Sequence, residues 1–201
     1  MTRTIVVVGA SLAGWRAAIE LRESGFDGRL VVVGEERHRP YDRPPLSKHV
    51  LAGTQPPEAV DLARADDPEV EWELGVRAVG LDVAAHAVAL ADGRTLAYDG
   101  LVVATGATPR RIGAWDLAAV HVLRTLDDCL SLRADLVASP TRLLVVGAGF
   151  IGAEVAATAR GLGVEVTMVE PLEVPVLRGL GPRLGAVVGD LHRERGVDLR
   201  L

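Results

Sequence analysis

Two glycine-rich turns are the segments of this sequence best suited to hold nucleotide phosphates. The first, residues 9–14, follows the apolar run 5–8, and the second, residues 147–152, follows the apolar run 143–146. Between a strand and a helix, glycines let the chain bend tightly and let backbone N–H groups approach a pyrophosphate at the helix N-terminus. Two such turns predict two bound dinucleotides.

The two turns match the dinucleotide-binding pattern to different degrees. The second supplies all three glycines of the pattern, whereas Ser11 stands at the middle position of the first. About 25 residues after each turn begins, the next predicted strand ends in a carboxylate, Glu35 or Glu170, which can bind ribose hydroxyls. Glu170 would repel a 2′-phosphate and so favours NAD over NADP; a solvent-facing glutamate is the alternative for either residue alone. Two such sites suggest electrons passing from a nicotinamide to a flavin.

The chain has one lysine and one cysteine, and each bears on which reaction the protein could catalyse. Lys48 is the one lysine among 22 basic residues, which makes it a candidate for a specific task, since lysine is a compact charge whose protonation can be tuned. Cys129 is the one cysteine, so these residues hold no C-x-x-C pair and no intrachain disulfide; we expect it as a small buried residue of a helix. The five histidines share no metal-ligand spacing with it, and no metal site is predicted.

The expected elements place each turn in a βαβ unit, one with strand 4–8, helix 12–24 and strand 29–34, the other with strand 142–146, helix 150–162 and strand 165–170. Between them we expect an ordered loop or a short helix after Pro45 within residues 37–54, a strand at 70–74, an antiparallel hairpin or meander within 77–103, a strand at 100–104 and a helix at 126–138, broken by Ser139–Pro140. Helix 181–195 and strand 197–201 follow. This order predicts an α/β fold with two Rossmann-like domains on parallel sheets, the first carrying the meander and the second incomplete.

Composition narrows the class of protein. A content of 49% hydrophobic and 24% charged residues is that of a globular core, and a net charge of −5 excludes the basic field that nucleic acid binding requires. The longest apolar runs are strand-length, so neither a membrane span nor a signal peptide is expected. We therefore expect a cytoplasmic protein.

The chain resembles the FAD-dependent, NADH-using ferredoxin reductases, the putidaredoxin-reductase and rubredoxin-reductase type of the two-dinucleotide-binding flavoprotein superfamily. The resemblance is carried by residues 9–14, 41–48, 104–109, 123–126 and 147–154. Its most specific element is the run Arg-Pro-Pro-Leu-Ser-Lys that ends at Lys48, because dithiol reductases and coenzyme A disulfide reductases carry a cysteine in or near this region.

The resemblance implies FAD and NAD as cofactors, and as partner an iron–sulfur ferredoxin or rubredoxin that feeds an oxygenase such as a cytochrome P450. The residues implied for FAD are Gly9, Ser11, Ala13, Gly14, Glu35, Arg43, Lys48, Ala78, Thr105, Gly106 and Arg124. Those implied for NADH are Gly147, Gly149, Ile151, Gly152 and Glu170. The implied catalytic residues are Lys48, which would stabilise negative charge on the reduced flavin, and Glu154, which would position the ammonium group.

After Pro109 the sequence changes to a connector and a helix, so a domain boundary is expected near residues 108–116. Residues 1–111 are expected as the FAD-binding domain and residues 112–201 as an incomplete NAD-binding domain, without the returning FAD segment and the C-terminal interface domain of longer family members. We expect such a fragment to be inactive by itself. An NADH oxidase, a nitrite-reductase-type flavin module and a non-catalytic FAD/NAD-binding sensor stay open as alternatives. The arginines within 36–39 and 110–111 are interpreted as solvated surface in preference to a ferredoxin docking site.

Overall fold

The computed structural model describes residues 3–62, 67, 69–111, 117–138 and 142–201. The chain divides into two compact units, one made of Met1–Asp42 and Val60–Thr108, the other of Arg43–Ala59 and Pro109–Leu201. The domain boundary expected between residues 111 and 112 stays a prediction, because residue 112 lies outside the described residues. The expected helix break at Ser139–Pro140 also lies outside them.

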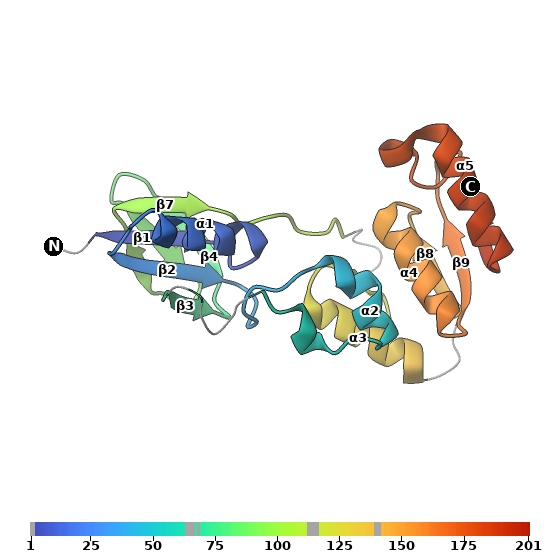
Figure 1. Ribbon diagram of the computed structural model, residues 1–201, viewed down its shortest axis with the longest axis horizontal. Helices are drawn as coiled ribbons and strands as arrows, with labels where there is room; N and C mark the ends of the chain where they lie inside the picture. The colour runs from blue at the N-terminus through green and yellow to red at the C-terminus, as the bar shows by residue number, and fades with distance from the viewer. Residues whose placement is uncertain (1–2, 63–66, 68, 112–116, 139–141) are drawn as a thin grey trace. The chain divides into compact units, whose positions relative to one another are not determined.

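A parallel sheet of four strands in the order β3-β2-β1-β7 forms the centre of the first unit (Figure 1). Its strands are β1 (Thr4–Val8), β2 (Arg29–Gly34), β3 (Glu71–Leu74) and β7 (Gly100–Val103), and α1 (Leu12–Glu23) connects β1 to β2. Strands that are covered on both faces read as continuous apolar runs, which is why β1 and β2 could be located from sequence. The predicted βαβ unit is confirmed.

The first unit has a hydrophobic core on each face of this sheet. Alternate side chains of β1 and β2 point to opposite faces, so neighbouring valines serve different cores. On one face Val7 and Val32 pack with Trp15 of α1. On the other face Val6 and Val31 pack against an antiparallel sheet in the order β4-β5-β6. This second sheet, made of β4 (Ala78–Asp82), β5 (Ala87–Leu90) and β6 (Thr95–Ala97), is the predicted meander.

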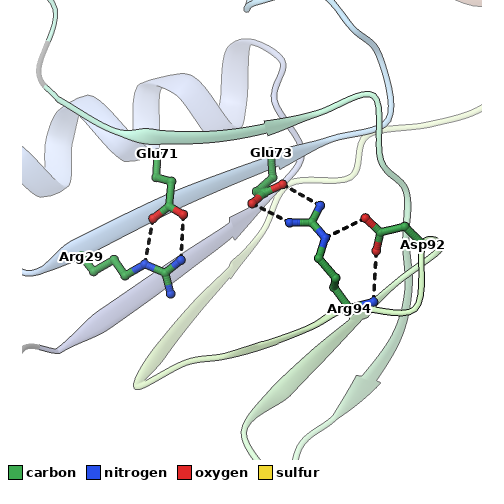
Figure 2. A network of polar contacts seen from close by, with 5 residues as sticks. All are labelled: Arg29, Glu71, Glu73, Asp92 and Arg94. Atoms are coloured by element: carbon green, nitrogen blue, oxygen red, sulfur yellow. Dashed lines mark hydrogen bonds and ion pairs between the residues drawn. The ribbon is translucent and has the colours of Figure 1, made fainter.

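Ion pairs connect β3, the edge strand of the parallel sheet, to the neighbouring elements (Figure 2). Arg29 of β2 pairs with Glu71 at 2.8 Å, and its hydrogen bonds lower the pKa of that carboxyl group. Arg94, in the turn between β5 and β6, pairs at 2.7 Å with both Glu73 of β3 and Asp92. Apart from Glu73, which is 19% exposed, these side chains are 40–50% exposed, so water and salt screen the pairs and each adds little to the free energy of unfolding.

The second unit contains a parallel sheet in the order β10-β9-β8. Its strands are β8 (Arg142–Val146), β9 (Glu165–Val169) and β10 (Val197–Arg200), connected by α4 (Phe150–Gly161) and α5 (Leu177–Glu194). Helix α5 was expected to begin at residue 181. It begins earlier, and Gly181, with a φ of +73°, interrupts it just before Pro182. Glycine tolerates that φ and proline has no N–H to donate, so one helical segment ends at this kink and a second begins there, close to the predicted start.

Residues 43–59 pack within the second unit against α3 (Leu126–Ala138) and α4. They form the short helices η1 (Pro44–Ser47) and α2 (His49–Ala52), followed by η2 (Pro57–Val60), so the expected short helix is present. Side chains of α3 bind their carbonyl groups: Arg133 Nη1 donates to Leu51 O at 2.7 Å, and Cys129 Sγ lies 3.1 Å from Leu46 O. The association of this segment with the second unit was not expected.

Apolar side chains of β8 are partly uncovered, with Leu144 60% and Val146 52% exposed. Within the described residues, no helix is long and apolar enough to cross a membrane. The α/β fold class with two parallel sheets and a separate antiparallel meander is confirmed.

Candidate functional site

The first glycine turn lies at the carboxyl end of the parallel sheet in the first unit. Gly9 follows β1 with a φ of +119°, and a Cβ atom there would lie 2.1 Å from Ala104 O at the end of β7. A Cβ atom on Gly14 would lie 1.8 Å from Gly9 O. Both glycines are therefore required by packing of the turn itself, and they let α1 begin immediately against the sheet.

Other residues implied for FAD gather at this same edge. Thr105 and Gly106 directly follow Ala104, and both are exposed. Glu35 directly follows β2, which pairs with β1, and its side chain is exposed. Ala78 begins β4, close to Val76, whose N–H donates to Gly34 O at 3.0 Å. Ser11 stands at the N-cap of α1 in extended conformation, with the exposed Ala13 in the first helical turn.

The second glycine turn has the same form as the first but leaves more room around its glycines. Gly147 follows β8 with a φ of +100°, and a Cβ atom on Gly152 would lie 2.0 Å from Gly147 O. At Gly149, the N-cap of α4, a Cβ atom would find no protein atom within 4 Å. Packing explains Gly152 and the positive φ explains Gly147, whereas neither explains Gly149, whose bare backbone leaves room for a molecule to approach from outside. The turn fits a pyrophosphate.

Glu170 directly follows β9 and its carboxylate lies at the second turn. Its Oε2 accepts a hydrogen bond from Ala148 N at 2.7 Å, and its Oε1 accepts one from Leu172 N at 3.2 Å. The strand order that places β9 beside β8 brings this glutamate to the turn, as its spacing in sequence predicted. Ile151, next to Gly152, is exposed.

Lys48 and Glu154 form an ion pair within the second unit. Lys48 Nζ lies 2.9 Å from Glu154 Oε2, and each side chain is 38% exposed. Lys48 stands between η1 and α2, and Glu154 is on α4. Burial raises the pKa of Glu154, but hydrogen bonds from Ser47 and Lys48 outweigh that effect and lower it overall. The carboxylate is therefore ionised at neutral pH and holds the ammonium group in place.

Two further residues of this site were not anticipated from the sequence. Ser47 Oγ donates to the same Glu154 Oε2 at 2.5 Å, and Thr158 Oγ1 donates to the backbone carbonyl of Ser47 at 2.8 Å. Thr158 is one helical turn beyond Glu154, on the same face of α4, and this i, i+4 spacing was the available signal. Ser47 is buried, which a serine beside a charged residue does not suggest.

Arg43 and Arg124, both implied for FAD, also meet in the second unit. Arg43 Nη1 donates to the carbonyl oxygen of Arg124 at 2.5 Å. The N–H of Arg124 in turn donates to Asp128 Oδ2 at 3.0 Å, at the start of α3. These bonds fix the backbone that leads into α3 against the segment that carries Lys48.

Cys129 is fully buried in α3, as expected for a structural cysteine. Burial raises the pKa of its thiol to about 11, so almost none of the nucleophilic thiolate is present at neutral pH. Within the described ranges, no group of three or more histidine, cysteine, aspartate or glutamate side chains could hold a metal ion.

Comparison with known proteins places these features in context. The model of the pyridine nucleotide-disulphide oxidoreductase family matches residues 3–201. The chain is 44% identical over 200 residues to the ferredoxin–NAD(+) reductase component of the p-cumate 2,3-dioxygenase system of Pseudomonas putida, covering 98% of this chain and 50% of that protein. It is 46% identical over 190 residues to the corresponding component of the biphenyl dioxygenase system of Paraburkholderia xenovorans (strain LB400), covering 92% and 46%.

A solved structure is similarly close. The putidaredoxin reductase–putidaredoxin covalent complex matches with a TM-score of 0.89 and 36% identity, over 98% of this chain and 49% of that one. The chain spans about half the length of the curated relatives it matches.

Proposed function

We propose, since this chain belongs to the pyridine nucleotide-disulphide oxidoreductase family, that it is part of an NADH-dependent ferredoxin reductase. The protein would pass electrons from NADH through FAD to a small iron–sulfur protein, a ferredoxin or rubredoxin, that feeds an oxygenase. The observation that carries the proposal is the presence of two glycine turns on two separate parallel sheets, each between a strand and a helix. The named relatives that are components of dioxygenase systems support the choice of acceptor.

The two turns are assigned to different nucleotides. For FAD we propose the residues of the first turn and its neighbours together with two arginines: Gly9, Ser11, Ala13, Gly14, Glu35, Arg43, Ala78, Thr105, Gly106 and Arg124. For NADH we propose the second turn and its glutamate: Gly147, Gly149, Ile151, Gly152 and Glu170. Glu170 supports NADH over NADPH, because a carboxylate beside the turn accepts hydrogen bonds from ribose hydroxyls and repels a 2′-phosphate.

The chemistry divides between the cofactors and the protein. When bound, NADH and FAD would supply the donor and acceptor of a hydride, and FAD would allow the two electrons to leave one at a time. In this proposal Lys48 would supply a positive charge to the flavin ring, which becomes negative on reduction, and would so lower the free energy of the reduced state. Glu154 orients the ammonium group of Lys48 through their ion pair at 2.9 Å.

The state of Cys129 favours a one-electron acceptor over a disulfide. Some flavoproteins with two dinucleotide sites pass electrons to a protein disulfide, and the reactive thiol of that pair must be accessible and have a low pKa. Cys129 is the one cysteine of this chain, is fully buried, and has a pKa raised by burial. Electron transfer through these residues therefore does not run through a protein dithiol. We also propose the cytoplasm as its location.

The test is to purify the full-length protein with its flavin and to mix it with NADH or NADPH without oxygen. We expect the flavin absorbance to bleach faster with NADH, and cytochrome c reduction to depend on added ferredoxin. A protein that binds no flavin, or that prefers NADPH, contradicts the assignment of the two turns. Cytochrome c reduction or oxygen consumption at the same rate without ferredoxin would instead indicate an oxidase.

Substitution of Lys48 tests its role in the same assay. Lys48→Met removes the charge but keeps much of the side-chain volume, so FAD should still bind while its reduction by NADH slows by roughly 10- to 100-fold. Arg183→Met, a loss of one exposed positive charge on α5, is the matched control and should leave the rate unchanged. An unchanged rate in Lys48→Met would remove Lys48 from the mechanism.

A further inference from the structure

We infer that Ser47 is a positioning residue that fixes the geometry of the Lys48–Glu154 pair, an inference that rests on the proposed function. Ser47 is held to α4 at two points, through its side chain and through its backbone. Its hydroxyl group donates to Glu154 Oε2 at 2.5 Å, and its carbonyl oxygen accepts from Thr158 Oγ1 at 2.8 Å. Glu154 and Thr158 are one turn apart on α4, so both attachments are on one helix face.

The hydroxyl proton of Ser47 is committed to Glu154. The other acceptor near Ser47 Oγ is Pro44 O, 3.4 Å away, which is longer than a usual O–H···O bond. Lys48 Nζ donates to the same Glu154 oxygen at 2.9 Å. Two donors therefore converge on one carboxylate oxygen. Hydrogen bonds to a charged acceptor are short and strong, so this oxygen is the fixed point to which the ammonium group is bound.

Without this anchor the lysine would be poorly placed. Lysine has a flexible side chain with about 2 kcal/mol of rotamer entropy, and the exposed fraction of 38% leaves room for other rotamers. Ser47 is 5% exposed and directly precedes Lys48, so the attachment of its backbone to Thr158 also fixes the origin of the lysine side chain. The bond from Ser47 to Glu154 fixes the partner of the Lys48 ammonium group, and the bond from Thr158 to Ser47 O fixes the backbone from which the Lys48 side chain starts.

The first experiment is a double-mutant cycle read by stopped-flow reduction of the flavin-loaded protein. Ser47→Ala should lower the limiting rate of flavin reduction about 3- to 10-fold, with less than about a twofold change in the apparent Kd of NADH. In a Lys48→Met background the same substitution should have no further effect on the rate, because the group that Ser47 positions is gone. Ser131→Ala, on the exposed side of α3, is the matched control and should be silent in both backgrounds.

A second pair of variants keeps the inference testable if Ser47→Ala does not fold. Thr158→Val removes the hydroxyl group at constant shape. It should slow flavin reduction when Lys48 is present and have no further effect in Lys48→Met. Thr158→Ser keeps the hydroxyl donor and should reduce the flavin at the rate of the unchanged protein.

The outcomes separate the inference from the proposed function. A wild-type flavin that NADH does not reduce overturns both. Reduction that Lys48→Met slows but Ser47→Ala leaves unchanged overturns the inference alone. Equal losses from Ser47→Ala with and without Lys48 also overturn it, because they indicate a general structural effect.

Discussion

The glycines of the second turn should separate a packing role from a binding role by substitution with alanine. A Cβ atom on Gly152 would lie 2.0 Å from Gly147 O, whereas one on Gly149 would meet no protein atom within 4 Å. Gly149 has a φ of −73° and a ψ of −177°, which alanine adopts without strain. Gly152→Ala should therefore destabilise the protein, and Gly149→Ala should leave the fold intact but obstruct the nucleotide.

The expected magnitudes follow from these contacts. Gly147 O cannot easily move, because the N–H of the same residue donates to Val169 O at 2.8 Å. Overpacking against fixed backbone costs about 1–3 kcal/mol of unfolding free energy, or roughly 2–12 °C in Tm at about 2–4 °C per kcal/mol. For Gly149→Ala, the entropic gain of about 0.4–1 kcal/mol is offset by the weaker N-cap, so Tm should stay nearly constant. The same overpacking against pyrophosphate should raise the Kd of NADH roughly 5- to 150-fold.

The assay combines thermal unfolding by circular dichroism with titration of NADH. Gly161→Ala is the matched control, since it is on α4, also has open space at its Cβ position, and lies at the far end of the helix. It should leave the Kd of NADH unchanged and should not lower Tm, because alanine favours a helix more than glycine does. If Gly149→Ala binds NADH as tightly as the unchanged protein, the bare backbone does not face a ligand and the second turn is not the NADH site. If Gly152→Ala does not lower Tm, the packing argument is wrong.

Three further predictions concern groups away from the turns. Burial lowers the pKa of His192 in the folded protein, whereas the unfolded chain has the ordinary pKa near 6.5. Below that pH the unfolded chain therefore binds more protons, and the unfolding free energy should decrease as the pH falls through it. The decrease should be smaller in His192→Leu. Identical urea transitions of the two proteins at about pH 7.5 and about pH 5.5 would contradict this. The buried thiol of Cys129, with a pKa of about 11, should react with a disulfide reagent at neutral pH only as fast as the protein opens, and rapid labelling in native buffer would refute it. Gly53→Ala should cost about 1–2 kcal/mol in chemical denaturation, because Gly53 has a φ of +73° and its Cβ atom would lie 2.1 Å from Arg133 Nη2; an unchanged midpoint would exclude both effects.

Local signals account for the parts of the fold that the sequence predicted well. The apolar runs of β1 and β2 are bounded by polar residues and glycine, so their limits agree with those expected. The alternation of β4, β5 and β6 around a turn at Asp92–Gly93 indicated an antiparallel sheet. Glu170 was found by spacing alone, because parallel neighbours end at the same edge of a sheet.

Long-range contacts account for what the sequence did not predict. Residues 43–59 associate with α3 and α4 through side chains that donate to their carbonyl groups, such as Arg133 and Thr158, and a carbonyl acceptor leaves no pattern in the sequence. The role of Ser47 was missed for the same reason, since its partner is more than a hundred residues away. The pairing of Lys48 with Glu154 came from family resemblance, and no local rule of spacing would have produced it.

The two backbone hydrogen bonds that Glu170 accepts have a consequence for the timing of ligand exchange. A side chain that must be immobilised when a ligand binds costs about 0.5–1.5 kcal/mol, or roughly 2- to 13-fold in Kd. Glu170 is already oriented by Ala148 and Leu172, whereas Glu35 extends into solvent. In the proposed assignment, the preorganised carboxylate of Glu170 suits NADH, a coenzyme that arrives and departs in every catalytic cycle. The carboxylate of Glu35, ordered only once, would suit FAD as a prosthetic group that stays bound.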